Sequence, residues 1–146
     1  MWDDFKGKTP SNSQNHAQSW VGIDFFGKCV ANKFVFEVTA VFNMDSSWVV
    51  EYKNTERLLK HEQGHFDIAE IFARKLRKRL GEIKQPCSNM DNTELLIQKL
   101  TKNNKIRLLS EQDDYDRETR HGSRKNRQKK WQEKISNRLK SLEKYK

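Results

Sequence analysis

The sequence has little apolar material and no long apolar run. Hydrophobic residues make up 34% of its 146 residues, the same share as charged residues. This length and composition predict a single domain over residues 1–146, with one modest core. No apolar stretch approaches the roughly 20 residues of a membrane-spanning helix. Internal repeats and low-complexity segments are also absent.

Two further features are missing. Residues 1–4 lack the basic and apolar regions of a signal peptide, and we interpret the abrupt start as that of a mature or trimmed form. The two cysteines, Cys29 and Cys87, do not form a C-x-x-C pair, which excludes a ribbon-type zinc site. In an exported protein they could form one disulfide, whereas in the cytosol they would be free thiols.

Positive charge is abundant but confined to one end of the chain. Residues 120–146 hold 11 Lys/Arg against 2 Asp/Glu, so this segment carries the whole net charge of +9. Such a tail can meet nucleic acid or an anionic surface, or form the solvated face of a helix. We favour the solvated helix face and do not expect nucleic acid as a partner.

The first third of the chain predicts a sheet. Residues 8–19 read as a loop in which His16 is a surface residue, and residues 20–26 read as a strand that Gly27-Lys28 ends. Residues 34–44 alternate between apolar and mostly polar positions, as in a strand with one buried face. Residues 46–50 form a turn and a short apolar piece. Together these segments predict an antiparallel sheet.

Residues 54–80 predict a long amphipathic helix. Asn54 or Thr55 can cap its start, and Gly81 can end it. Ile68, Ala69 and Phe72 share one face and should be buried.

Two further helical regions should follow the linker at 82–91. Residues 91–119 predict a helix that Asn103-Asn104 could break in two. Its expected apolar side consists of Leu95, Leu96, Ile97, Leu100, Ile106, Leu108 and Leu109. Residues 124–144 predict the last helix, which should pack on the core through Trp131, Ile135, Leu139 and Leu142.

The long helix contains the pattern H-E-x-x-H at residues 61–65. At helical spacing His61 and His65 lie one turn apart on one face, so that both imidazoles can bind one Zn²⁺. Glu62 is offset from them and can act as general base toward a zinc-activated water. Gly64 costs the helix about 1 kcal/mol, which suggests that a backbone or a substrate approaches closely there.

A catalytic zinc usually has a third protein ligand. Residues 113–122 offer a histidine and several carboxylates. His121 is the only histidine after His65, so a three-histidine site must use it or His16, and Glu118 is the rival for a His-His-Glu site. Glu70 is a weaker candidate because it lies about 140° round the helix from His65.

Other polar residues near these ligands could support them. Asp67, Glu70 and Asp116 are candidates for holding the free ring nitrogens of the histidines, and Glu118 is a further supporting carboxylate. Tyr115 is a candidate donor to an oxyanion.

The blocks HEQGHFDIAE and YDRETRHG, followed by Gln128 and Trp131, resemble a bacterial family of uncharacterised domains described as predicted secreted zinc-dependent proteases. The opening WDDFKG and the SSWV before the long helix also fit its pattern. The resemblance covers residues 2–145. It implies an α+β fold, a small zincin-like domain in which an antiparallel sheet packs on the H-E-x-x-H helix and further helices follow.

The resemblance also implies a site. Zinc would be held by His61 and His65, with Glu62 as base and His121 as third ligand. It further implies a secreted or periplasmic location, which makes a Cys29–Cys87 disulfide plausible.

Two functions follow as hypotheses. The first is a zinc metallopeptidase that hydrolyses peptide bonds in a peptide or protein substrate. The second is a non-catalytic, zinc-stabilised binding module whose basic segment contacts an anionic partner; four protein ligands on the metal would favour it.

Overall fold

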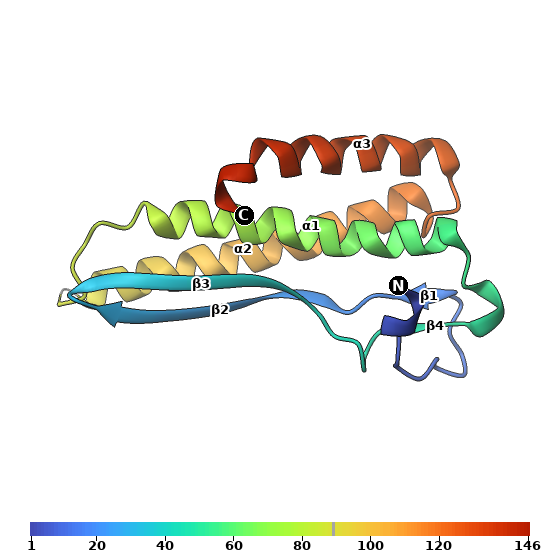
Figure 1. The fold of residues 1–146 in the computed structure, drawn as a ribbon, viewed down its shortest axis with the longest axis horizontal. Coiled ribbons are helices and arrows are strands. Elements are labelled where there is room, and N and C mark those ends of the chain that lie inside the picture. Colours follow the sequence, from blue (N-terminus) through green and yellow to red (C-terminus); the bar gives the residue numbers. More distant parts are fainter. Residues whose placement is uncertain (89) are drawn as a thin grey trace.

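The computed structural model describes residues 1–88 and 90–146, and they form an α+β structure with small antiparallel strand pairs and three α-helices (Figure 1). The strands are β1 (Ala17–Gln18), β2 (Val21–Val30), β3 (Lys33–Phe42) and β4 (Trp48–Val49). The helices are α1 (Glu56–Gly81), α2 (Met90–Thr119) and α3 (Lys125–Ser141). Short 3-10 turns lie at Trp2–Asp4, Glu51–Lys53 and Glu143–Tyr145. None of the described helices has the length and apolar character to cross a membrane.

A long hairpin of β2 and β3 covers one side of the helices (Figure 1). The inward residues of β3 alternate as expected, and Val38 is buried against Ala73, Leu76 and Leu80 of α1. The predicted end of the first strand at Gly27-Lys28 is wrong, because β2 continues to Val30. The ring of Phe36 on β3 covers Gly27, and a Cβ atom there would lie 3.2 Å from that ring.

Helix α1 lies between the hairpin and α3, with α2 alongside (Figure 1). Thr55 caps its start, and the Thr55 hydroxyl accepts a hydrogen bond of 3.2 Å from the Leu58 amide. Ile68, Ala69 and Phe72 are buried in the core, as predicted. The helix ends at Gly81.

Helix α2 is one continuous helix, so the break considered at Asn103-Asn104 does not occur. The helix propensity of Asn costs only a few tenths of a kcal/mol, which packing against α1 offsets. The linker expected at 82–91 includes Asn89, which lies outside the described residues.

Only part of the expected apolar side of α2 is buried. Leu108 is 4% exposed, and Ile97 and Leu100 pack against the α1 core. The expectation is wrong for Leu95, Leu96, Ile106 and Leu109, which are exposed. Helix α2 meets α1 along one narrow stripe, so that its other apolar side chains face solvent.

The expected stripe of α3 is confirmed. Trp131 and Ile135 are buried, and Leu139 and Leu142 pack against the same core. The Trp131 indole donates a hydrogen bond of 2.9 Å to Glu118 of α2, and its ring packs edge-on to Tyr115. Helix α3 therefore holds the C-terminal half of α2 in place.

The N-terminal segment is fixed beside the start of α1. Strand β1 pairs with β4, and the Val50 amide donates to the carbonyl of His16. The Trp20 amide donates to the buried Ser47 hydroxyl at 2.9 Å. These bonds place residues 15–20 beside the helix that carries H-E-x-x-H.

A disulfide joins Cys29, near the end of the β2–β3 hairpin, to Cys87, after α1. It links positions 58 residues apart. The Cys87 amide also donates to the carbonyl of Asn32. The disulfide therefore anchors the far end of the hairpin to the chain between α1 and α2.

A partly buried ion-pair network joins α1 to the C-terminus. Glu70 accepts hydrogen bonds of 2.8 Å from Arg74 and 3.1 Å from Arg77, and Arg74 also donates to the Leu139 carbonyl. Burial disfavours the Glu70 carboxylate, but the two arginines outweigh this effect and lower its pKa. Glu70 is thus a structural residue, and in the described chain it does not contact a site histidine.

The Glu70→Gln variant is expected to lose about 2 kcal/mol of unfolding free energy at pH 7, because it removes the closer and more buried of the two carboxylates that pair with the 5%-exposed Arg74 and leaves only Glu143. Because folding lowers the pKa of Glu70, its carboxylate stabilises the folded protein at pH values above its unfolded-state pKa of about 4.3. The difference from wild type should therefore shrink as the pH falls below 4.3 through the folded-state value. Urea unfolding at several pH values measures it, and a difference that stays constant contradicts the assignment. Exposed Glu56→Gln is the control, with no measurable loss expected.

Candidate metal centre

Helix α1 presents His61 and His65 on one buried face. The two residues are 1% and 9% exposed, and their ring centroids lie 4.9 Å apart. The spacing of four residues places them one turn apart, as the motif predicts. Burial of two imidazoles requires that each ring nitrogen find a partner.

Helix α2 and the turn after it supply the remaining polar groups. A single carboxylate oxygen, Oδ1 of Asp116, lies 3.0 Å from Nε2 of His61 and 3.1 Å from Nε2 of His65. The same oxygen lies 3.3 Å from Nδ1 of His121. Three histidines therefore face one point. Among the described residues, the donor atoms of His61, His65 and Asp116 form a group within 4.8 Å of one another.

The protonation of His61 follows from its hydrogen-bond chain. The Tyr115 hydroxyl donates to the His61 carbonyl at 3.1 Å, so it must accept the 2.6 Å hydrogen bond from the Gln128 amide nitrogen. This arrangement turns the Gln128 oxygen toward Nδ1 of His61, at 3.1 Å. An amide oxygen only accepts, so Nδ1 carries the hydrogen. In neutral His61 the Nε2 lone pair therefore points at Asp116.

The same reasoning applies to His65. The Gln112 amide nitrogen donates to the His65 carbonyl at 2.9 Å, which turns the Gln112 oxygen toward Nδ1 of the same histidine. Nδ1 must then donate, and Nε2 is left with a lone pair. Both histidines thus have the tautomer that a metal bound through Nε2 requires.

These lone pairs give the cluster a strong preference for a cation. Two neutral Nε2 atoms and a carboxylate oxygen would repel one another at about 3 Å unless a proton or a metal ion neutralised them. Burial disfavours the charged form of Asp116, but its contacts with the His61 and His65 rings, which can donate from Nε2 only when protonated, outweigh burial and hold the Asp116 pKa well below its usual range. Burial likewise opposes protonation of His65, but Asp116 outweighs it and raises the His65 pKa.

Tyr115 lies behind the histidines. Its side chain is fully buried, and its ring stacks on His61 with centroids 4.6 Å apart. Burial raises the Tyr115 pKa, so the hydroxyl stays protonated. Since its one hydrogen is donated to the His61 carbonyl, Tyr115 positions His61 in this structure and offers no free hydrogen to an oxyanion.

Tyr115 also explains the glycine within α1. A Cβ atom on Gly64 would lie 2.3 Å from the Tyr115 hydroxyl oxygen and 2.8 Å from its ring carbon. The expected close approach is therefore made by a tyrosine side chain, rather than by a backbone or a substrate. Gly122, with φ +72°, lies equally close to His61: a Cβ atom on Gly122 would be 2.8 Å from the Cβ atom of His61.

Gly64→Ala is expected to destabilise the protein by about 2 kcal/mol, because overpacking displaces the buried tyrosine ring. Gly81→Ala is the matched control at the end of the same helix, where a Cβ atom meets nothing within 4 Å. It should be neutral or stabilising by up to about 1 kcal/mol. Thermal unfolding of both variants measures the contrast, and an equal response at the two positions contradicts the packing argument.

Glu62 lies beside the histidines and is 4% exposed. The Ser19 hydroxyl, on the segment between β1 and β2, donates to one Glu62 oxygen at 2.6 Å. Both residues line a cavity of about 240 Å³ together with His61, His65, Asp116 and His121. The expected base, the histidines and a space for a small ligand therefore occur together.

The other predicted site residues lie elsewhere. Glu118, the rival third ligand, accepts from Trp131 and is not in the donor group. Asp67 accepts from Gln63, and Glu70 pairs with arginines, so neither holds a ring nitrogen. Asp116 does contact the histidines, as expected. It contacts their Nε2 atoms, which are the nitrogens that would bind a metal, and not the other ring nitrogens that a supporting carboxylate would hold.

Sequence reasoning gave no site role to three residues, Gln112, Gln128 and Ser19, although Gln128 was part of the pattern that carries the family resemblance. Gln112 lies one turn before Asp116, which is the one regularity that could have identified it.

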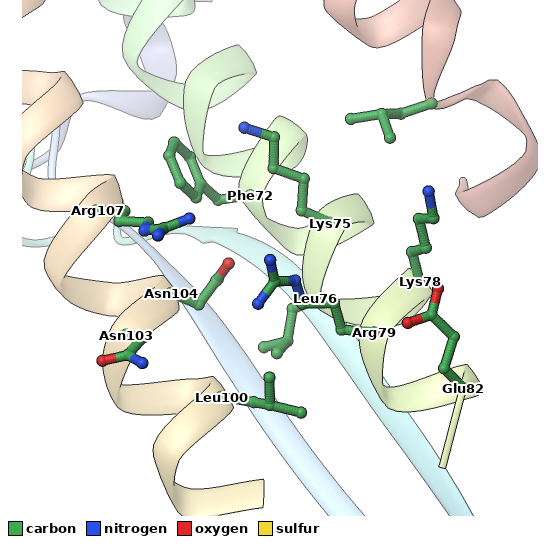
Figure 2. Close-up of a pocket in the computed structure, with 11 residues that line it drawn as sticks. Phe72, Lys75, Leu76, Lys78, Arg79, Glu82, Leu100, Asn103, Asn104 and Arg107 are labelled. Atoms are coloured by element: carbon green, nitrogen blue, oxygen red, sulfur yellow. The ribbon is translucent and has the colours of Figure 1, made fainter. Parts of the chain in front are cut away.

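A second cavity of about 480 Å³ lies between α1 and α2, toward the end of α1 that is remote from the histidines (Figure 2). Arg79 of α1 and Asn104 and Arg107 of α2 point into it. Of the residues that the structure describes, Glu82 is the one carboxylate that lines this cavity, and no histidine or cysteine does so. It therefore offers no set of metal ligands.

A family model described as "Bacterial protein of unknown function (DUF922)" matches residues 5–122. The chain therefore belongs to this bacterial family of unknown function. The matched region contains H-E-x-x-H, Asp116 and His121 and ends before α3. Searches of curated proteins and of solved structures returned no match.

Proposed function

We propose that this protein is a zinc-dependent metallopeptidase with a zincin-like site. The observation that carries the proposal is the convergence of the His61 and His65 Nε2 atoms on one oxygen of Asp116, beside the buried Glu62. Hydrogen-bond direction leaves both Nε2 atoms free to bind a metal.

The donor set fits zinc. Two imidazole nitrogens and one carboxylate oxygen are a common ligand set of catalytic zinc sites. Ligand atoms of a tetrahedral ion with bonds of about 2.0–2.1 Å lie roughly 3.3 Å apart. The distances from Asp116 to the two histidines, 3.0 and 3.1 Å, are close to that separation. We therefore propose His61, His65 and Asp116 as ligands, and His121 stays a prediction as third or further ligand.

Each residue of the chain then has a role. Zinc, when bound, supplies a Lewis acid that polarises the scissile carbonyl and acidifies water. Glu62 takes up the proton of the attacking water and passes it to the leaving amine. Ser19 holds one oxygen of Glu62, which leaves the other oxygen for that proton. Gln112 and Gln128 fix the tautomers of the ligands.

One observation favours the second function, a zinc-stabilised binding module. His121 lies 3.3 Å from the same Asp116 oxygen, so that four protein groups surround the site. A metal with four protein ligands has no open position for a substrate. The basic α3 would then contact an anionic partner, and its binding should weaken steeply with salt.

We also propose that the protein is exported. The disulfide between Cys29 and Cys87 is the observation that supports this, because disulfides persist in oxidising compartments and are rare in the cytosol.

Hydrolysis of an unfolded, fluorescently labelled protein tests the peptidase proposal. The metal-free protein is expected to be inactive, and stoichiometric Zn²⁺ should restore cleavage. Cleavage that survives removal of metal contradicts the proposal, as does a zinc-loaded protein that cleaves no component of a broad peptide mixture.

A further inference from the structure

Two cavities meet at the metal centre. The first, of about 240 Å³, contains the histidines, and the second, of about 420 Å³, lies on the other side of Glu62. Asn15, Ala17, Glu62 and His121 line both. The two cavities are therefore adjacent, and we treat them as the two arms of one cleft, which we call the site cleft.

The arms lie on opposite sides of Glu62 along α1. The first arm reaches His65, and the second reaches back to Leu58. At 1.5 Å per residue these positions are roughly 10 Å apart on the helix. An extended peptide covers this distance with about three residues. A substrate that crosses Glu62 would thus place different residues in the two arms.

The first arm has an apolar rim. Trp20 and Leu109 line it and are 57% and 53% exposed. They come from separate elements, Trp20 from the segment before β2 and Leu109 from α2. Large apolar side chains that stay exposed around a cavity indicate a surface that binds an apolar group.

The second arm is basic. Lys53, Arg57 and Arg120 line it, and in the described chain no carboxylate lies within 4 Å of their charged groups. At some other surface positions cations do pair, as in Lys60 with Glu56 and Arg117 with Asp114. Among the described residues, Glu62 is the one carboxylate that lines this arm. Three cations without acidic partners make the arm favourable for negative charge and unfavourable for positive charge.

From these two arms we infer the substrate class: a peptide with a bulky apolar residue on one side of the scissile bond and an Asp or Glu side chain on the other. That a peptide bond is cleaved rests on the proposed peptidase function. The preference for an apolar and an acidic side chain is argued from the residues that line the cleft. The apolar residue contacts Trp20 and Leu109. The acidic residue lies among Lys53, Arg57 and Arg120, where a Lys side chain would be repelled.

Binding of end-blocked, fluorescently labelled peptides to zinc-loaded Glu62→Gln protein tests the inference without turnover. The reference peptide carries Leu and Glu three residues apart, and an isomer carries them in the opposite order. Two matched peptides replace Glu by Lys or Leu by Gly. Fluorescence anisotropy measures the affinities, and each replacement is expected to weaken the better isomer by about tenfold or more.

Charge reversal in the second arm locates the effect. Arg120→Glu and Lys53→Glu, made separately, should weaken the acidic peptide and strengthen its Lys counterpart. Trp20→Ala should reduce the advantage of Leu over Gly. Lys102→Glu is the control, because Lys102 is an exposed cation on α2 that lines neither arm.

The outcomes separate the two claims. Equal affinity for the Glu and Lys peptides, an equal shift in the Lys102→Glu control, or no binding by any peptide overturns the inferred substrate class. The expected preference in binding, with no cleavage by the wild-type protein, supports the inference and rejects the peptidase function. Cleavage of all peptides without preference rejects the inference alone.

Discussion

Glu62→Gln is expected to lower kcat/KM for peptide hydrolysis by about a thousandfold while zinc remains bound. Glutamine has the shape of glutamate but cannot take up the proton of the attacking water. Its amide oxygen can still accept the hydrogen bond from Ser19, so the local structure should persist. Initial rates with saturating zinc, together with the zinc content of both proteins, measure the effect.

The Glu56→Gln variant is the matched control for this experiment. Glu56 lies on the same helix, is exposed and pairs with Lys60 instead of facing the site cleft. Its replacement should leave the rate unchanged. Wild-type activity in the Glu62→Gln protein at equal zinc content would show that Glu62 is not the base, and loss of zinc from that protein would show that it is a ligand.

His65→Ala is expected to reduce zinc affinity by more than a hundredfold, since it removes one of the donors that face the centre. Gln112→Leu should reduce it less, by about 10–100-fold, because it removes only the group that fixes the His65 tautomer. Competition with a chromophoric chelator measures both values. His16→Ala is the control, because His16 is exposed and outside the donor group. An equal loss in the control variant would contradict the proposed ligand set.

Zinc affinity should also rise with pH. Asp116 raises the pKa of His65 in the metal-free protein, so a proton must leave His65 before its Nε2 can bind metal. The apparent affinity should therefore increase until the pH exceeds the raised His65 pKa and then level off. Calorimetry in buffers of different ionisation enthalpy counts the released protons. Below the raised His65 pKa, binding without proton release would mean that His65 is not a ligand.

Periodicity predicted the elements that carry the site. The apolar face of α1, the alternation of β3 and the stripe of α3 are consequences of burial on one side, which sequence spacing records directly. Residues that commonly end a strand or a helix predicted the element boundaries less well. Gly27 lies within a strand and Asn103-Asn104 within a helix, because cross-strand and interhelical packing decide there.

The histidine pair and Glu62 were predictable because their spacing is local to one helix. The groups around them were not, because they depend on how three helices pack. Asp116 was one of several carboxylates in its segment, and only the position of α2 shows that it faces both Nε2 atoms. Gln112 follows no motif, and Gln128 entered only as part of the family resemblance, so the three-dimensional hydrogen-bond chains alone reveal their roles.

We propose that His61, His65 and Asp116 form a catalytic-type zinc centre. Diffraction from zinc-soaked crystals at the zinc absorption edge tests it most directly. We expect one strong anomalous peak in contact with both histidines and Asp116, with a position left open to solvent. A peak that His121 also contacts, with no open position, would support the zinc-stabilised binding module. The absence of a peak between the two histidines would contradict the claim.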